Sequence, residues 1–304
     1  MIACPLCGSA RATTFAVQDA RSGYDGHVTA CLGCGTGRLV PPPTDAQLAA
    51  AYAEYPQHTR PATVRSERPL LALNQSLWRG AIPRPLALGI LSAVETVTAR
   101  AIPLKYRIPL MLPRTSRILD VGVATGHYLR LLRSIGFERL AGFDIVENPT
   151  VRSTLPHADL RFGPTLDAVG FTPQSFDVVT LVHTLEHVPD PVGVLRVVRA
   201  LLAPNGRAII EVPDFGGWVA RTSPTTFSHL AVPQHLWHFS ARGLAIVCAA
   251  AGLTPRRMQH SFSPVVAAES LPDEPRRRRF LLRPFGHFRG MLGSGTELSI
   301  ECRV

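Results

Sequence analysis

From residue 117 to residue 304, strand-like and helix-like segments alternate. Short runs rich in Val, Ile and Leu are separated by helical patterns, which we expect at 126–135, 190–202 and 240–251. Such alternation is typical of a mainly parallel, doubly wound sheet with helices on both faces. The segments that read as strands are RILDVG (117–122), LAGFDI (140–145), ADLRFG (158–163), FDVVTLV (176–182), RAIIEV (207–212), TPRRMQH (254–260) and TELSIECRV (296–304). The sequence therefore predicts an α/β domain with a mainly parallel seven-stranded sheet.

The loop DVGVATG, residues 120–126, follows the first of these strands. In doubly wound sheets, ligands bind beyond the carboxyl ends of the strands, where glycines let backbone amides approach and a helix N-terminus offers N–H groups. Asp144 ends the second strand, and a carboxylate there can accept both hydroxyls of a ribose. The nicotinamide fingerprint needs glycines at 122, 124 and 127, whereas the chain has Ala124 and His127. A phosphate-binding P-loop also lacks its Gly-Lys-Ser/Thr. We expect another adenosine-containing ligand.

Two Cys-x-x-Cys pairs lie in the first forty residues: Cys4 with Cys7, and Cys31 with Cys34. Each pair is followed by glycine, and two such turns together supply the four sulfur ligands of a tetrahedral zinc ion. Four sulfur ligands leave no open position, so the metal is expected to be structural zinc. We predict a zinc ribbon with short strands near 13–17, 27–30 and 36–40.

Composition shifts divide the chain into three predicted parts: a zinc ribbon (1–43), a helical linker or cover (44–114) and a ligand-binding domain (115–304). Thr44 is a candidate N-cap for a short helix, and the pattern over 69–112 is helical but broken by prolines. The apolar stretch 85–97 is shorter than the roughly 20 residues that cross a bilayer. No secretory signal opens the sequence, so we expect a cytoplasmic protein.

At this point a family resemblance becomes specific. The segment ILDVGVATGHYLRLLRSIGFERLAGFDI resembles the first two motifs of class I S-adenosylmethionine-dependent methyltransferases. FDVVTLVHTLEHVPDP, VLRVVRALLAPNGRAIIEVP and QHLWHFSARGLAIVCAAAGL resemble later segments of the same family, in the same order. The resemblance covers roughly 115–304 and implies a Rossmann-like fold that binds S-adenosyl-L-methionine. A four-cysteine ribbon ahead of this domain is similar to sugar and natural-product methyltransferases.

The resemblance implies roles for individual residues. Asp120 would anchor the methionine amino group, the loop amides would face the carboxylate and sugar, and Asp144 would hold the ribose. The cofactor contacts implied in this way are Asp120, Gly122, Val123, Ala124, Gly126, Asp144, Ile145 and His183. Ala124 replaces the family's middle glycine, and we expect its methyl group to be tolerated beside a carboxylate.

Methyl transfer to oxygen or carbon needs a base near the acceptor and an in-line approach to the sulfonium. Histidine suits this role because its pKa lies near neutrality. His187 and His235 are the preferred bases, and His183 is a third catalytic candidate. The alternative is structural: His187 caps a turn, and one of the histidines in QHLWHFS bonds a carbonyl and packs on Trp237.

The expected acceptor is a hydroxyl, or alternatively a carbon, of a sugar, glycan precursor or other small metabolite. The fourth strand lacks the Asn/Asp-Pro-Pro-Tyr/Phe sequence used on base nitrogens, and basic stretches interleaved with aromatics are missing, which disfavours nucleic acid. RNA methylation remains an alternative, as does a non-catalytic zinc-containing interaction protein. The net charge of +10 favours an anionic partner. The basic segment 276–289 is a candidate contact for a phosphate or an anionic membrane.

Overall fold

The computed structural model describes residues 3–53, 103–107, 111–270 and 293–304, with isolated positions between 83 and 93. Most of the helices expected over 69–112 and the whole basic segment 276–289 lie outside the described residues. Inside 69–112 the structure describes the short helix α4 (Leu104–Arg107). No helix in the described ranges is long and apolar enough to cross a membrane.

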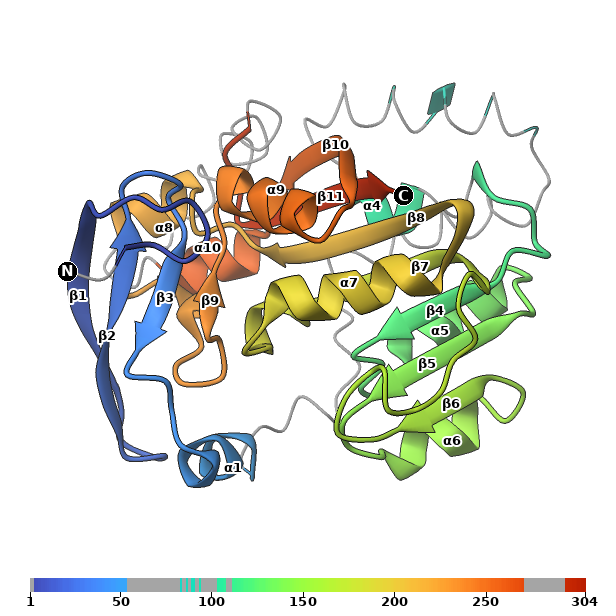
Figure 1. The fold of residues 1–304 in the computed structure, drawn as a ribbon, viewed down its shortest axis with the longest axis horizontal. Helices are drawn as coiled ribbons and strands as arrows, with labels where there is room; N and C mark the ends of the chain where they lie inside the picture. Colours follow the sequence, from blue (N-terminus) through green and yellow to red (C-terminus); the bar gives the residue numbers. More distant parts are fainter. Residues whose placement is uncertain are drawn as a thin grey trace.

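A seven-stranded sheet forms the centre of the molecule (Figure 1), in the order β10-β11-β8-β7-β4-β5-β6. β4 to β8 run parallel, and β11 is antiparallel to both β8 and β10. The prediction of a mainly parallel seven-stranded sheet is confirmed. Its strands are β4 (Ile118–Val121), β5 (Leu140–Asp144), β6 (Asp159–Phe162), β7 (Phe176–Val182), β8 (Leu202–Pro213), β10 (Thr254–Ser261) and β11 (Glu297–Arg303).

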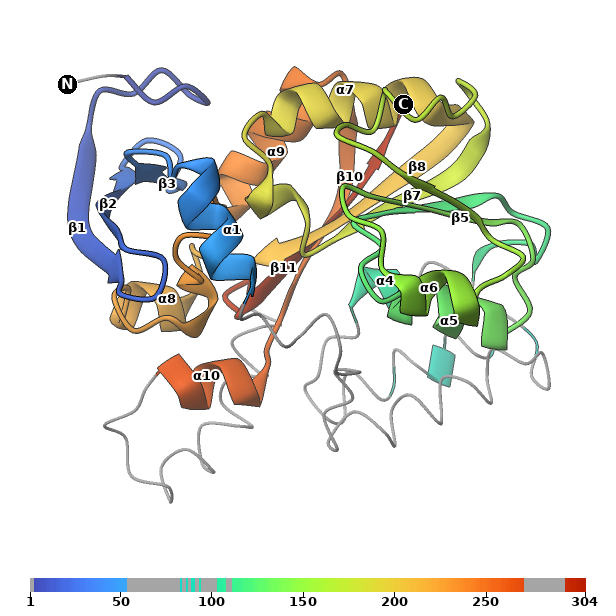
Figure 2. The same ribbon diagram turned by 90° about the horizontal axis from the view of Figure 1, so that it is seen from below.

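Helices cover both faces of this sheet, as Figure 2 shows. α7 (Pro191–Leu201) and α9 (Ala241–Ala250) bury their apolar residues against one face, and α5 (His127–Ser134) packs against the other together with α4. α7 begins where Asp190 accepts a hydrogen bond from Gly193 N, and α9 begins at Ser240 in the same way. Three further helices of the described part of this domain are α6 (Pro149–Thr154), α8 (Trp218–Thr222) and α10 (Pro264–Ser270).

The N-terminal segment forms a separate antiparallel sheet of β1 (Ala12–Asp19), β2 (Tyr24–Cys31), β3 (Gly37–Val40) and β9 (Trp237–His238). The three N-terminal strands confirm the expected short strands. β9 was not expected: it comes from far along the chain and pairs with β3, with His238 opposite Gly37. A side chain at position 37 would collide with Val28, because its Cβ would lie 2.9 Å from Val28 Cγ1. A glycine therefore permits the close approach.

The helix after the ribbon, α1 (Asp45–Ala53), begins at the expected cap. Thr44 Oγ1 accepts from Gln47 N at 3.3 Å, and the Gln47 side chain accepts from Thr44 N at 3.0 Å. These reciprocal bonds form a capping box that fixes the first turn. At its other end the helix contacts the late part of the chain, where Gln234 Nε2 donates to Ala51 O.

Candidate functional site

The loop between β4 and α5 has an unusual backbone. Gly122, Ala124 and Gly126 all have positive φ, at 82°, 45° and 74°. A Cβ at Gly122 would lie 2.2 Å from Thr184 Oγ1, and one at Gly126 would lie 2.5 Å from Val151 Cγ2. Glycine is therefore required twice, by both conformation and space. Ala124 adopts a left-handed backbone although it is not a glycine.

Asp144 closes over this loop from the end of β5. Its Oδ2 accepts from Ala124 N at 2.8 Å, and its Oδ1 accepts from Ile145 N at 2.8 Å. The structure thus brings the predicted ribose carboxylate next to the predicted cofactor loop. Ile145 and Val146 are 65% and 69% exposed. Their apolar side chains form a surface beside the carboxylate, on which a flat ring could pack.

Asp120 lies in β4, one residue before the end of the strand, and is buried. Thr180 on the neighbouring strand β7 donates to its Oδ1 at 2.6 Å. Burial raises the pKa of Asp120 to about 7, although the Thr180 hydrogen bond acts in the opposite direction. A cationic ligand beside this carboxyl group would favour its ionised form.

A row of charged side chains continues across the sheet from Asp120. Glu211 on β8 is 2% exposed and lies 2.5 Å from Lys105 Nζ of α4, and Ser299 of β11 donates to its other oxygen at 3.0 Å. Burial alone would raise the pKa of Glu211, but Lys105 lowers it. Neither residue was proposed from the sequence. The signal was present, because an acid inside the apolar strand RAIIEV is rare without a partner.

His183 follows β7 directly and has φ of 51°, a strained conformation for a residue other than glycine. Its ring lies 3.4 Å from Glu186 Oε1 and 3.5 Å from Glu297 Oε2. Burial would lower the pKa of His183, but Glu297, Glu186 and Glu211 together raise it to about 9. At neutral pH this imidazole holds a proton, so it suits charge stabilisation better than proton removal.

Two of the predicted catalytic residues, His187 and His235, lie next to each other in the structure. Their rings meet edge to face with centroids 4.6 Å apart. His235 Nδ1 lies 2.8 Å from the carbonyl oxygen of His229, and His187 Nδ1 lies 3.0 Å from that of Gln234. Burial lowers the pKa of His235 well below its usual value, and the neighbouring histidines add to this effect. His235 is therefore neutral over the physiological range.

Tyr52 of α1 also belongs to this cluster, since its hydroxyl lies 3.0 Å from His187 Nδ1. No sequence pattern points to Tyr52, because its position depends on how the helix packs. His238, in contrast, points into the core with its Nε2 unbonded among the described residues. Burial lowers its pKa to about 4. His238 packs on Phe215, with ring centroids 5.3 Å apart. The carbonyl contact expected of one histidine in QHLWHFS is made by His235 instead.

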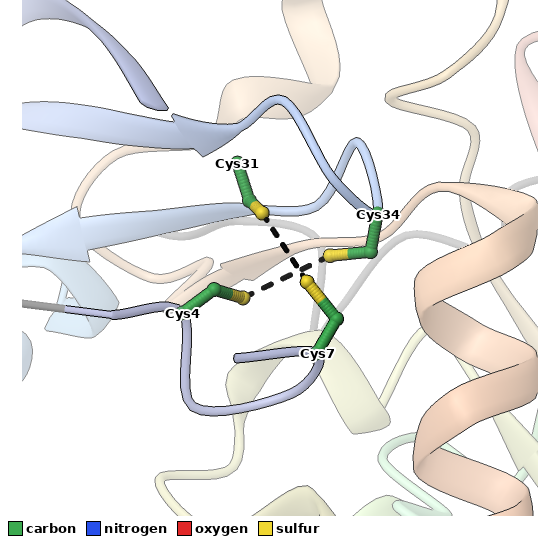
Figure 3. Close-up of side chains that lie close together, drawn as sticks. All are labelled: Cys4, Cys7, Cys31 and Cys34. Atoms are coloured by element: carbon green, nitrogen blue, oxygen red, sulfur yellow. Dashed lines mark hydrogen bonds between the residues drawn. The ribbon is translucent and has the colours of Figure 1, made fainter. Parts of the chain in front are cut away.

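The four N-terminal cysteines meet between two turns (Figure 3). Cys4 Sγ lies 3.8 Å from Cys34 Sγ, and Cys7 Sγ lies 3.5 Å from Cys31 Sγ. A tetrahedral ion with about 2.3 Å bonds to sulfur holds its ligands about 3.8 Å apart, which matches these distances. Burial would raise the pKa of Cys31, but backbone N–H groups of Cys34 and Gly33 and neighbouring thiols lower it to about 6. The donor set and its spacing fit zinc.

Comparisons with known proteins find relatives that are named as methyltransferases. The chain is 29% identical over 161 residues to the "Ubiquinone biosynthesis O-methyltransferase" of Neisseria meningitidis serogroup C, covering 46% of this chain and 64% of the relative. It is 36% identical over 103 residues to the protein of that name from Aeromonas salmonicida, covering 31% and 42%. The matched part is thus less than two thirds of these relatives' own length.

A solved S-adenosylmethionine-dependent methyltransferase from Mesorhizobium loti superimposes with a TM-score of 0.47 at 17% identity, covering 65% of this chain and 96% of that one. The family model described as "Methyltransferase domain" matches residues 94–257, which is more than half of the chain. This match includes the glycine loop, Asp144 and the histidine-bearing end of β7. The chain belongs to the methyltransferase-domain family, with the fold of the class I S-adenosylmethionine-dependent enzymes.

Proposed function

We propose that the protein transfers the methyl group of S-adenosyl-L-methionine to a hydroxyl oxygen of a small acceptor. The observation that supports the proposal best is the hydrogen bond from the Ala124 amide to Asp144, since this carboxylate, which we propose holds the ribose, lies beside the glycine loop. Asp120 is the candidate partner of the methionine amino group. Gly122, Val123, Gly126, Ile145 and His183 complete the proposed cofactor contacts.

The acceptor site is proposed at the neighbouring strand ends, where His183, Glu186, His187 and His235 gather. In the reaction an oxygen lone pair of the hydroxyl attacks the methyl carbon while the carbon–sulfur bond breaks. The bonding electrons move to sulfur, which becomes a neutral thioether, and the hydroxyl proton leaves the acceptor. His187 and His235 are proposed to activate the hydroxyl, and the His183 cation to stabilise negative charge on the oxygen.

We propose two classes of acceptor, which the experiment described below distinguishes. The cysteine ribbon favours a sugar or glycan precursor, whereas the relatives are named for O-methylation in ubiquinone biosynthesis. The buried carboxylates of Glu186 and Glu211 can accept hydrogen bonds from a second hydroxyl in either class. We further propose that Cys4, Cys7, Cys31 and Cys34 hold a structural zinc ion.

The test uses methyl-labelled cofactor with a panel of nucleotide sugars, free sugars and hydroxylated aromatic rings. We expect label in an ether product from one class, and no product when the hydroxyl is replaced by hydrogen. The Asp144→Asn variant should lose turnover at subsaturating cofactor. Label transfer to nitrogen or carbon alone, or to RNA alone, would contradict O-methylation of a small molecule.

A further inference from the structure

Glu186 is a buried carboxylate that is only partly compensated, by the His183 cation near one of its oxygens. The residue is fully buried in the 3-10 helix Leu185–His187. Neither of its carboxylate oxygens has a hydrogen-bond partner among the described residues, although Oε1 lies 3.4 Å from His183 Nδ1. Burying an ionised carboxylate without bonding costs several kcal/mol, so buried acids are usually paired or bind a metal ion. His183 compensates Oε1, and Oε2, which has no partner among the described residues, can bind a positively charged ligand.

In the two neighbouring imidazoles, hydrogen bonds indicate which ring nitrogen carries the lone pair. His187 Nδ1 and His235 Nδ1 each face a backbone carbonyl oxygen, at 3.0 and 2.8 Å. A carbonyl oxygen only accepts, so we assign the hydrogen to each Nδ1 and the lone pair to each Nε2. With this assignment the Tyr52 hydroxyl oxygen, 3.0 Å from His187 Nδ1, also accepts from that nitrogen. Anchoring one ring N–H to a carbonyl is also how metal-binding histidines are usually oriented.

One ligand atom from each of Glu186, His187 and His235 lies within 4.8 Å of the others. An ion bonded to all three at about 2.1 Å would hold these atoms about 3 to 3.5 Å apart, so the site needs to close by only a small movement. Two imidazoles and one carboxylate are a ligand set used for divalent transition metals, and three ligands leave coordination positions open.

We propose that Glu186, His187 and His235 bind a divalent transition-metal ion, separate from the ion of the cysteine ribbon. The acceptor part of the argument rests on the proposed function: an open position would take the oxygen of the acceptor hydroxyl. Coordination lowers the pKa of that hydroxyl, whose proton passes to water before the oxygen attacks the methyl carbon. The histidines then act as ligands rather than as direct proton acceptors.

The test is a titration of the full-length protein, its ribbon already loaded with zinc, with Co²⁺ followed by absorption. A nitrogen–oxygen site gives weak visible bands without the strong thiolate charge-transfer bands of a cysteine site. We expect one Co²⁺ per chain with such bands. Glu186→Gln and His235→Gln should each weaken binding by about 100-fold, since either removes one of three ligands. His238→Gln, a buried neighbouring histidine outside the triad, should bind Co²⁺ as the unmodified protein does.

Far-ultraviolet circular dichroism and S-adenosylmethionine titration of every variant show which of them are folded. If Glu186→Gln does not fold, His235→Gln decides. The proposal is overturned if the folded, zinc-loaded protein gives no nitrogen–oxygen bands, or if the triad variants bind Co²⁺ unchanged. Co²⁺ binding without S-adenosylmethionine binding would instead contradict the proposed function and leave the metal site standing.

Discussion

Ala124 stands where the family usually has glycine, and its backbone conformation in the structure is strained. A non-glycine residue at φ of 45° is strained by about 1 to 2 kcal/mol. The sequence indicated the departure, because the alanine stands at the middle glycine position. It did not indicate that the amide of this residue would bond Asp144, since that contact depends on how β5 lies beside β4.

We expect Ala124→Gly to stabilise the free protein by about 0.5 to 1 kcal/mol, after the entropic cost of glycine is subtracted. Thermal unfolding measures this as a rise of about 1 to 4 °C. The same substitution at Ala249, exposed in α9, should instead lower the melting temperature, because it removes a good helix former. A fall in melting temperature for Ala124→Gly would mean that residue 124 is not strained.

Asp120 gives the site a pH dependence. Its pKa in the folded protein is raised to about 7, so it is protonated below that pH and ionised above it. If Asp120 binds the methionine ammonium group, it must ionise, and cofactor affinity should rise from pH 6 to pH 8. Calorimetry in two buffers of different ionisation enthalpy should detect proton release at pH 6. Asp120→Asn should abolish both effects, and a pH-independent affinity in the unmodified protein would contradict the assignment.

Among the helices and strands, those with a clear hydrophobic pattern could be predicted from the sequence. β4, β5 and β7 are short apolar runs whose positions agree with the sequence pattern, and Gly122 and Asp144 mark the ends of β4 and β5. β9 has only two residues and no periodicity, and it exists because β3 offers it an edge. Glu211 and Lys105 form a pair from segments about a hundred residues apart, so no local pattern links them. Such contacts arise from packing.

We expect the backbone amides of the ribbon and of β9 to lose their protection against hydrogen exchange together. Cys34 O accepts a hydrogen bond from Ser240 Oγ, directly after β9, so the cysteine turn supports that strand. We expect Cys31→Ala to reduce zinc from one to none per chain and to speed amide exchange in β1, β2, β3 and β9 by about tenfold or more. Exchange in β4, β5 and β7 should not change. Cys248→Ala, a buried thiol outside the ribbon, should keep its zinc.

Retained zinc in Cys31→Ala would contradict the four-cysteine site. Faster exchange in β1 to β3 alone would contradict the coupling to β9.

At the scale of the whole molecule, the N-terminal ribbon and the methyltransferase domain share structure. Val17, Val28 and Leu39 of the ribbon pack in one cluster with Phe215 and Trp218, which follow β8. α1 then reaches the histidine cluster through Tyr52. The predicted division at residues 43 and 114 stays a prediction about the chain. In space, the ribbon supports the segment that carries His235 beside the proposed acceptor site.

The central claim is that Asp144 and the glycine loop bind S-adenosyl-L-methionine, and calorimetric titration tests it most directly. We predict saturable binding at one site per chain. Asp144→Asn should weaken binding by about tenfold or more, a loss of about 1.4 kcal/mol or more. Glu147→Gln, which changes an exposed acid three residues away, should leave the Kd unchanged. No binding to the folded protein, or equal binding by Asp144→Asn, would contradict the account.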